Sequence, residues 1–165
     1  MRLTDWTDYT LRVLMYCGVH ATARLVTIAE MADNYGVSRH HLTKIVNELS
    51  RQGLLETVRG RSGGLRLAKP AAQIRLGAVV RAAEPDFRLV ECFDPATDTC
   101  PLTPVCRLKR VLHHALDAYL AELDRTTLAD LLPPARSMNR AMGLPMTFMA
   151  PPGRSSATAK TTRPR

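Results

Sequence analysis

Residues 27–53 read TIAEMADNYGVSRHHLTKIVNELSRQG, and this segment indicates two short helices joined by a tight turn. Thr27 and Glu30 have the spacing of a capping box, in which the hydroxyl accepts from the later backbone amide and the carboxylate reaches back. Gly36 is suited to ending the first helix, because glycine adopts a positive φ at little cost. Ser38 is a suitable N-cap for the second helix. The segment therefore predicts a helix-turn-helix.

The second of these helices has one apolar and one polar side. Its apolar residues recur at the helical spacing i, i+3, i+4 and i+7, as Leu42, Ile45, Val46 and Leu49. Its polar residues and its cap can donate to phosphates and to base edges in a major groove. They are Ser38, Arg39, His40, His41, Thr43, Lys44 and Asn47. For this helix alone, an ordinary solvated face is an equal alternative.

A β-hairpin is predicted directly after this helix. Residues 54–58 have the pattern of a strand, residues 59–64 (RGRSGG) of a glycine-rich turn, and residues 65–68 of a return strand. Glycines at the tip allow close approach of the backbone to DNA, and arginines can enter a narrow minor groove. We therefore predict a wing that contacts DNA through Arg59, Arg61 and Ser62, rather than a plain exposed hairpin.

Charge divides the chain into three parts. The 165 residues include 23 Lys and Arg against 15 Asp and Glu, a net charge of +8. Residues 1–75, the predicted winged helix-turn-helix domain, carry +5, residues 76–132 carry −3, and residues 133–165 carry +6. The overall balance favours nucleic acid as partner. The Pro-rich tail, predicted to be a flexible arm, either attracts phosphate or keeps the protein in solution.

The sequence predicts a cytoplasmic protein without a membrane partner. It contains no apolar run of the roughly 18 residues that a membrane span needs. Asp5, Asp8 and Arg12 interrupt the apolar residues at the N-terminus, which argues against a signal peptide. In a reducing compartment, cysteines are expected to be thiols or metal ligands rather than disulfides.

Three of the four cysteines fall in one acidic segment. After a predicted helix at 76–83, residues 84–106 are irregular and contain Cys92, Cys100 and Cys106 with the spacing C-x7-C-x5-C. This spacing matches neither a zinc ribbon nor a bacterial ferredoxin run, so iron–sulfur, zinc and free thiols all stay open. Cys17 lies on the apolar side of a predicted helix at 7–21 and is expected to be a core cysteine.

A long amphipathic helix follows, with Thr103 as its expected cap and Pro104 as its first residue. One side of this helix is apolar, through Leu108, Val111, Leu112, Ala115, Tyr119 and Leu123. In a small DNA-binding protein such a helix indicates a dimer interface, which suits a palindromic operator. A short last helix is predicted at 127–132. The expected fold is mainly α with a small β-hairpin wing: a winged helix-turn-helix domain plus a long dimerisation helix.

These residues resemble the NsrR-type nitric-oxide-sensing iron–sulfur repressors, within the winged-helix family that also contains IscR. The similarity extends over about residues 1–132. It is carried by residues 3–12, 35–47, 58–70, 92, 100–109 and 127–131. The wing and the surroundings of the third cysteine are the most specific parts.

The resemblance implies a homodimer with one iron–sulfur cluster per subunit, 4Fe-4S favoured over 2Fe-2S, held by Cys92, Cys100 and Cys106. It implies Asp8 of the partner subunit as fourth ligand; the alternative for Asp8, taken alone, is a carboxylate at a helix N-terminus that the dipole favours. IscR-like proteins have a histidine three residues after the third cysteine. Lys109 stands there and is a poor ligand while protonated, so His113 is the next candidate.

By resemblance, the chain is expected to be a repressor that nitric oxide releases from the operators of nitric oxide detoxification genes. The nearest alternative is the same fold sensing iron–sulfur, iron or redox status. An enzyme, for example a thiol oxidoreductase using Cys100 or Cys106, is disfavoured because the sequence lacks a C-x-x-C motif. We therefore expect the chain not to be an enzyme.

Overall fold

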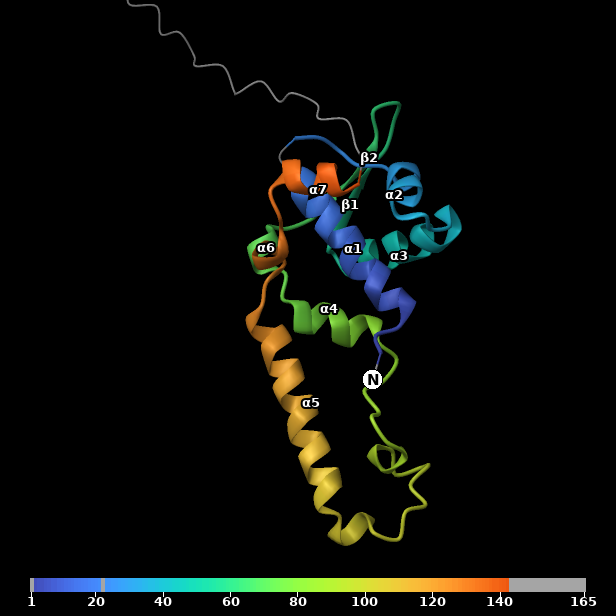
Figure 1. Ribbon diagram of the computed structural model, residues 1–165. Helices are drawn as coiled ribbons and strands as arrows, with labels where there is room; N and C mark the ends of the chain where they lie inside the picture. Colours follow the sequence, from blue (N-terminus) through green and yellow to red (C-terminus); the bar gives the residue numbers. More distant parts are fainter. Residues whose placement is uncertain (1, 22, 143–165) are drawn as a thin grey trace, which may run out of the picture.

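The computed structural model describes residues 2–21 and 23–142. The described chain is mainly helical, with one two-stranded antiparallel sheet and short 3-10 turns (Figure 1). The helices are α1 Asp5–His20, α2 Ile28–Tyr35, α3 Arg39–Arg51, α4 Leu76–Ala83, α5 Arg107–Arg125, α6 Leu128–Leu131 and α7 Ala135–Ala141. The strands are β1 Leu55–Val58 and β2 Gly64–Leu67, and the 3-10 turns are η1 Ala71–Gln73, η2 Glu91–Phe93 and η3 Thr103–Val105.

Helix α1 is the centre of the core. It contacts α3, β2, α4, α6 and α7, and Figure 1 shows it running through the body of the molecule. Its buried residues include Leu14, Tyr16 and Cys17, which confirms the expected place of Cys17 in the core. Leu128 of α6 is also fully buried, so residues after the long helix complete the hydrophobic core of the N-terminal module.

The helix-turn-helix forms as predicted, with two differences in its caps. Gly36 ends α2 in the left-handed conformation at φ 64°, and the Thr27 side chain accepts a hydrogen bond from the Glu30 amide. The Glu30 carboxylate, however, is bound mainly by Tyr16 and Arg24, and the Thr27 backbone amide makes only a minor contribution to it. Ser38 occupies the N-cap position of α3 but makes no capping hydrogen bond with its side chain. A reciprocal capping box is found instead at Thr127, at the start of α6.

The predicted wing is present as β1 and β2, with Leu55 paired to Leu67 and Val58 paired to Gly64. Val26 adds an antiparallel bridge to β2, which fixes the hairpin against the body. Gly63 is needed at the tip, because a Cβ there would lie 2.4 Å from the backbone oxygen of Val58.

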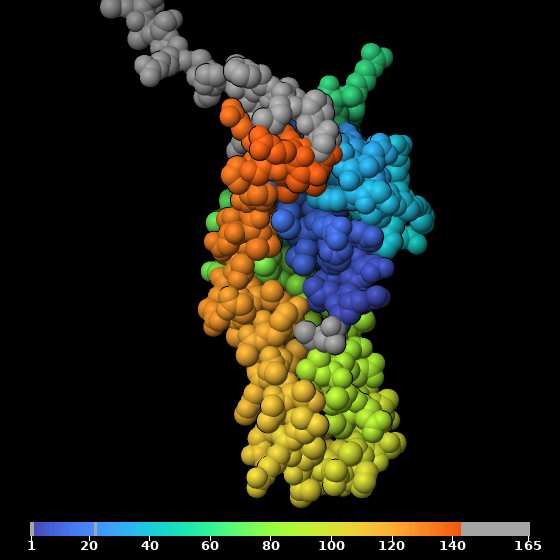
Figure 2. Space-filling model, in the orientation of Figure 1, coloured from blue at the N-terminus to red at the C-terminus, as the bar shows by residue number. Residues whose placement is uncertain are grey.

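Residues 76–126 leave the body and return to it as an arm. Its two ends are joined at the base, where the Leu76 amide donates to Thr126 and the Leu128 amide donates to Ile74. At its base α4 packs on α1; the loop 84–106 and α5 form the rest of the arm, which Figure 2 shows projecting below the body. The two ends of the arm are therefore fixed to each other beside α6.

Two predictions about segment boundaries are wrong. Helix α5 does not begin at Pro104: η3 comes first, and Cys106 is the N-cap of a helix that starts at Arg107. The Thr103 hydroxyl donates to Asp98 at 2.9 Å instead of capping α5. The tail predicted as a flexible arm over residues 133–165 does not begin as one, because α7 forms at Ala135–Ala141 and Met138 is buried. The rest of the tail, residues 143–165, lies outside the described residues.

Candidate nucleic-acid interface and thiol loop

Helix α3 presents a polar face to solvent. Exposed along this helix and its cap are Ser38, Arg39, His40, Thr43, Lys44 and Asn47, as the sequence pattern predicts. Arg39 is held by Asp33 at 3.2 Å, and Thr43 donates to the Arg39 carbonyl oxygen at 2.8 Å. These contacts are exposed and individually weak, so the side chains can exchange them for phosphate or base partners.

His41 is placed differently from the other polar residues of α3. Its ring lies 5.8 Å from Trp6 and 5.4 Å from Tyr9, both on α1, with the second pair edge-on. Its Nε2 is buried and has no hydrogen-bond partner within the described residues. His41 therefore serves here as an aromatic contact between α1 and α3, which the sequence could not show because the contact is tertiary.

The wing presents its cations to solvent. Arg59, Arg61 and Ser62 are all exposed at the tip. Arg66, on β2, differs from them because its guanidinium makes two hydrogen bonds to Glu56 across the hairpin, at 2.9 and 3.0 Å. That pair raises the pKa of Arg66 and lowers the pKa of Glu56, chiefly through the side-chain hydrogen bond. The tip arginines are thus the wing cations available to a polyanion.

A polar network fixes α2 against α1, and sequence reasoning missed it. Tyr16 donates to Glu30, Asn34 donates to Tyr16 at 2.9 Å, and Arg24 donates to Glu30 at 2.8 Å. Burial, followed by the Glu30 hydrogen bond, raises the pKa of Tyr16 to about 12. The network ties α2, the first helix of the helix-turn-helix, to the core helix α1. The sequence did not point to this network, because the position of Glu30 is already explained by a capping box with Thr27.

The three loop cysteines are free thiols of intermediate exposure. Cys92 lies in η2, Cys100 precedes η3, and Cys106 is the N-cap of α5, where its Sγ accepts the Lys109 amide at 3.4 Å. Within residues 2–21 and 23–142, no group of three or more His, Cys, Asp or Glu side chains is gathered closely enough to hold a metal ion. The structure therefore places the thiols on one loop without bringing them together.

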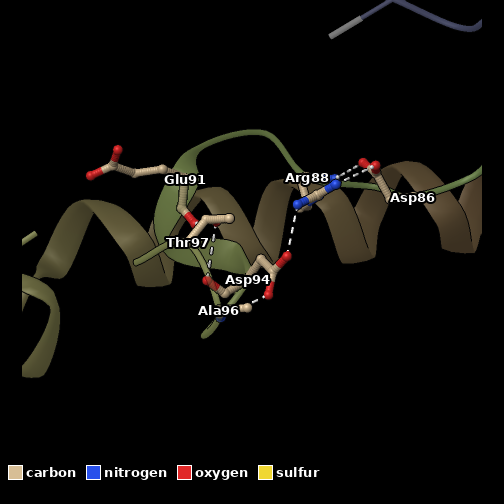
Figure 3. A network of polar contacts seen from close by, with 6 residues as sticks. All are labelled: Asp86, Arg88, Glu91, Asp94, Ala96 and Thr97. Carbon is tan, nitrogen blue, oxygen red and sulfur yellow. Dashed lines mark hydrogen bonds and ion pairs between the residues drawn. The ribbon is translucent and has the colours of Figure 1, made fainter. Parts of the chain in front are cut away.

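Polar contacts order this loop around the cysteines. Figure 3 shows Arg88 bridging Asp86 and Asp94, with nitrogen–oxygen distances of 3.1 and 2.7 Å. In the same view, the Thr97 hydroxyl donates to the Glu91 carbonyl, beside Cys92, at 3.1 Å. Asp98 accepts from the Cys100 amide at 3.1 Å and from Thr103. The loop thus has a defined path in which two of its carboxylates, those of Asp86 and Asp94, are held by one arginine.

The other ligand candidates are engaged elsewhere in the chain. The Asp8 side chain is 45% exposed and forms an ion pair with Arg12 at 2.7 Å. Asp8 lies in the first turn of α1, where the helix dipole favours a carboxylate. His113 of α5 stacks flat on Phe93, with ring centroids 3.9 Å apart. Lys109 lies 3.9 Å from Asp98. The stacking fixes η2, and Cys92 within it, beside α5.

An apolar stripe is left open along the arm. Leu102, Val105, Leu108 and Val111 are each more than 60% exposed, and no residue of α5 is buried. Scattered exposed apolar side chains are ordinary, but these four recur at every third residue from η3 into α5. The sequence identified the helical part of this stripe and missed Leu102 and Val105, because they precede the helix. Within the described residues, no helix is long and apolar enough to cross a membrane.

Comparison with known proteins places this geometry in a family. The family model Rrf2, described as an iron-dependent transcriptional regulator, matches residues 3–134. The HTH-type transcriptional regulator NsrR of Halalkalibacterium halodurans is 51% identical over 132 residues, covering 80% of this chain and 90% of that protein. NsrR of Geobacillus kaustophilus is 52% identical over 132 residues, again covering 80% of this chain and 90% of the relative.

Solved structures show the same fold. The oxidized form of Staphylococcus aureus CymR has a TM-score of 0.64 at 26% identity, covering 79% of this chain and 95% of that one. T. potens IscR has a TM-score of 0.64 at 20% identity, and the match covers 91% of this chain and 94% of that one. The predicted winged-helix fold is confirmed, and so is the expectation that the chain is no enzyme, because its relatives are transcriptional regulators. The chain belongs to the Rrf2 family of DNA-binding transcriptional regulators.

Proposed function

We propose that this regulator is a cytoplasmic homodimeric repressor that binds a palindromic operator and is released from it by nitric oxide. One observation supports the DNA-binding part of this proposal: the polar face of α3 and the arginines of the wing tip are both exposed to solvent. The first can read a major groove while the second reaches an adjacent minor groove. His41 contributes indirectly in this proposal, by fixing α3 to α1.

The open apolar stripe supports dimerisation through α5. A second copy packing on Leu102, Val105, Leu108 and Val111 would remove from water side chains that are 61–75% exposed in one chain. A two-fold interface would pair the same stripe with itself and give two DNA-reading heads related by symmetry. A palindromic operator matches that symmetry.

The donor set supports an iron–sulfur cluster held by Cys92, Cys100 and Cys106, with Asp8 of the partner subunit completing it. The fit is chemical: three free thiols lie on one loop, and Cys106 is the N-cap of α5, where its Sγ accepts the Lys109 amide. Since the thiols are not gathered in the isolated chain, cluster binding requires the loop 84–106 to close. We favour 4Fe-4S over 2Fe-2S. When bound, the cluster would supply iron with which nitric oxide reacts.

The chain's own contacts suggest how such a site would act on DNA binding. Asp8 is on the first turn of α1, between Trp6 and Tyr9, which are the two residues that contact His41 of α3. A restraint on Asp8 therefore acts on the part of α1 that positions α3. Its release would free Asp8 to pair with Arg12, as in the single chain, and would loosen the relative pose of the two heads. Specific affinity would then fall.

The cluster assignment is tested by single substitutions in protein reconstituted without oxygen. Cys92→Ala, Cys100→Ala and Cys106→Ala should each lose most iron, sulfide and visible absorption, because water does not replace a thiolate on iron. Cys17→Ala is the matched control and should keep the cluster, since Cys17 is 1% exposed in the core. Full loading of the three loop variants, or loss of the cluster in the Cys17 variant alone, would contradict the assignment.

A further inference from the structure

Helix α5 has two different sides. Lys109 and His113 are four residues apart and so lie on one face, which begins at the N-cap Cys106. The exposed apolar residues Leu108 and Val111 follow Cys106 and Lys109 by two positions each, which turns them by about 200° around the helix axis. The face that carries His113 is therefore separate from the apolar stripe, and the loop that carries the cysteines contacts it.

The loop folds back onto this face of α5 at two points. Phe93, in η2, stacks flat on His113, with ring centroids 3.9 Å apart and ring planes 5° from parallel. Farther along the loop, the Asp98 carboxylate lies 3.9 Å from the Lys109 ammonium. Because Phe93 directly follows Cys92 in the sequence, the stack bears on the position of that thiol.

The stack differs from the polar contacts of the same turn. Arg88 pairs with Asp94 at 2.7 Å, and the Thr97 hydroxyl donates to the Glu91 carbonyl oxygen at 3.1 Å (Figure 3). The six residues drawn in Figure 3 all belong to the loop, so the contacts between them shape the turn without attaching it to α5. The aromatic stack, by contrast, joins the turn to α5. Loss of the stack should therefore release η2 from the helix without unfolding it.

We propose that His113 is a positioning residue, whose ring face holds the turn carrying Cys92 on the side of α5 that begins at Cys106. In a flat stack the imidazole nitrogens lie at the ring edge and take no part, so His113 acts without being a ligand. This inference rests on the proposed function as a cluster-binding repressor. Two of the three proposed thiolate ligands are then attached to one helix beforehand, and closure of the loop mainly requires the segment around Cys100 to move. Such preorganisation reduces the conformational entropy that is lost on assembly.

The first measurement uses the full-length apo protein, so that no cluster is needed. Hydrogen exchange followed by mass spectrometry reports on η2, where the Phe93 amide donates to the Val90 carbonyl oxygen. His113→Ala should speed exchange in this turn by roughly 2- to 13-fold, the range that corresponds to loss of one aromatic pair. His113→Phe keeps a flat ring and should retain the protection. His114→Ala is the matched control, because His114 is the next residue of α5 and is also exposed.

A substitution on the other side of the stack checks that the effect belongs to this contact. Phe93→Leu keeps an apolar side chain but removes the ring, and should speed exchange as His113→Ala does. Combining the two substitutions should add little, because each removes the same contact.

The second measurement follows cluster uptake by the same variants during anaerobic reconstitution, from iron and sulfide content and visible absorption. His113→Ala and Phe93→Leu should load more slowly than the unaltered protein, by a factor similar to that in exchange. His113→Phe and His114→Ala should load as the unaltered protein does. Circular dichroism and Tm check that each variant is folded.

Two results would overturn the positioning role. One is a His113→Ala variant that exchanges and loads like the unaltered protein. The other is a His113→Phe variant that keeps η2 protected but loses the cluster, because a ring nitrogen would then be a ligand. Failure of the proposed function looks different: the unaltered protein itself would take up no cluster, and the positioning role would fail with it.

Discussion

Removal of the two wing-tip arginines should weaken DNA binding and also change its salt dependence. Arg59 and Arg61 are exposed at the tip, whereas Arg66 on the same hairpin is bound to Glu56 at 2.9 Å. The double variant Arg59→Ala, Arg61→Ala therefore removes cations that can reach phosphate. Arg66→Ala, on the return strand of the same hairpin, removes a cation that is already neutralised within the protein and is the control.

The magnitude follows from counterion release. Each arginine–phosphate pair contributes about 0.9 to the salt slope, so the double variant should lose roughly two units per subunit and four per dimer. At 0.15 M salt, removing one such pair corresponds to roughly 0.7 decades in affinity, which gives an upper bound of about 10³-fold for four pairs. The assay is anisotropy with a labelled promoter fragment over a KCl series. Equal slopes for the double variant, Arg66→Ala and the unaltered protein would refute the wing assignment.

Four further outcomes are expected. Asp8→Ala should weaken operator binding and alter the visible spectrum, although loss of a negative charge alone would strengthen attraction to phosphate; equal or tighter binding with an unchanged spectrum would show that Asp8 is not a ligand. In the apo protein at pH 8, iodoacetamide should label the three loop cysteines but not Cys17, whose pKa burial raises to about 12; mass spectrometry of labelled Cys17 without denaturant would contradict this. Leu128→Ala should lower the free energy of unfolding by about 2–5 kcal/mol and Tm by roughly 5–15 °C, because Leu128 is fully buried; a Tm within about 1 °C of the unaltered protein would place it outside the core. Burial lowers the pKa of His20, so the unfolded state binds the proton more readily, and the free energy of unfolding should fall as the pH drops below about 6.5; a denaturation series in which His20→Gln shows the same pH dependence would refute this.

The sequence was sufficient for the helix-turn-helix because its determinants are local. Leu42, Ile45 and Leu49 repeat at helical spacing, and Gly36 supplies the positive φ that the turn needs. The wing was predictable for the same reason, since a glycine-rich turn between two short apolar strands can close in few ways. These features do not depend on distant parts of the chain.

The features that the sequence did not reveal involve contacts between distant segments. His41 has the sequence context of a DNA-reading residue, and only the docking of α3 on α1 places it against Trp6. Helix α7 has one buried anchor, Met138, which is too little for a recognisable periodicity. The start of α5 was misplaced because Asp98 competes for the Thr103 hydroxyl. The three cysteines are on one loop as expected, but the described chain does not gather them. Their proposed assembly would need a cluster and a second chain, and local spacing encodes neither.

The central claim is that a cluster on this chain couples nitric oxide to operator release. The most direct measurement is an anaerobic titration of the reconstituted dimer with nitric oxide, recording visible absorption and binding to a labelled promoter fragment in the same sample. The account predicts that loss of the cluster spectrum and loss of DNA binding follow the same titration curve, and that apo protein binds weakly throughout. Tight binding that persists after the spectrum has been lost, or apo protein that binds as tightly as holo protein, would contradict the account.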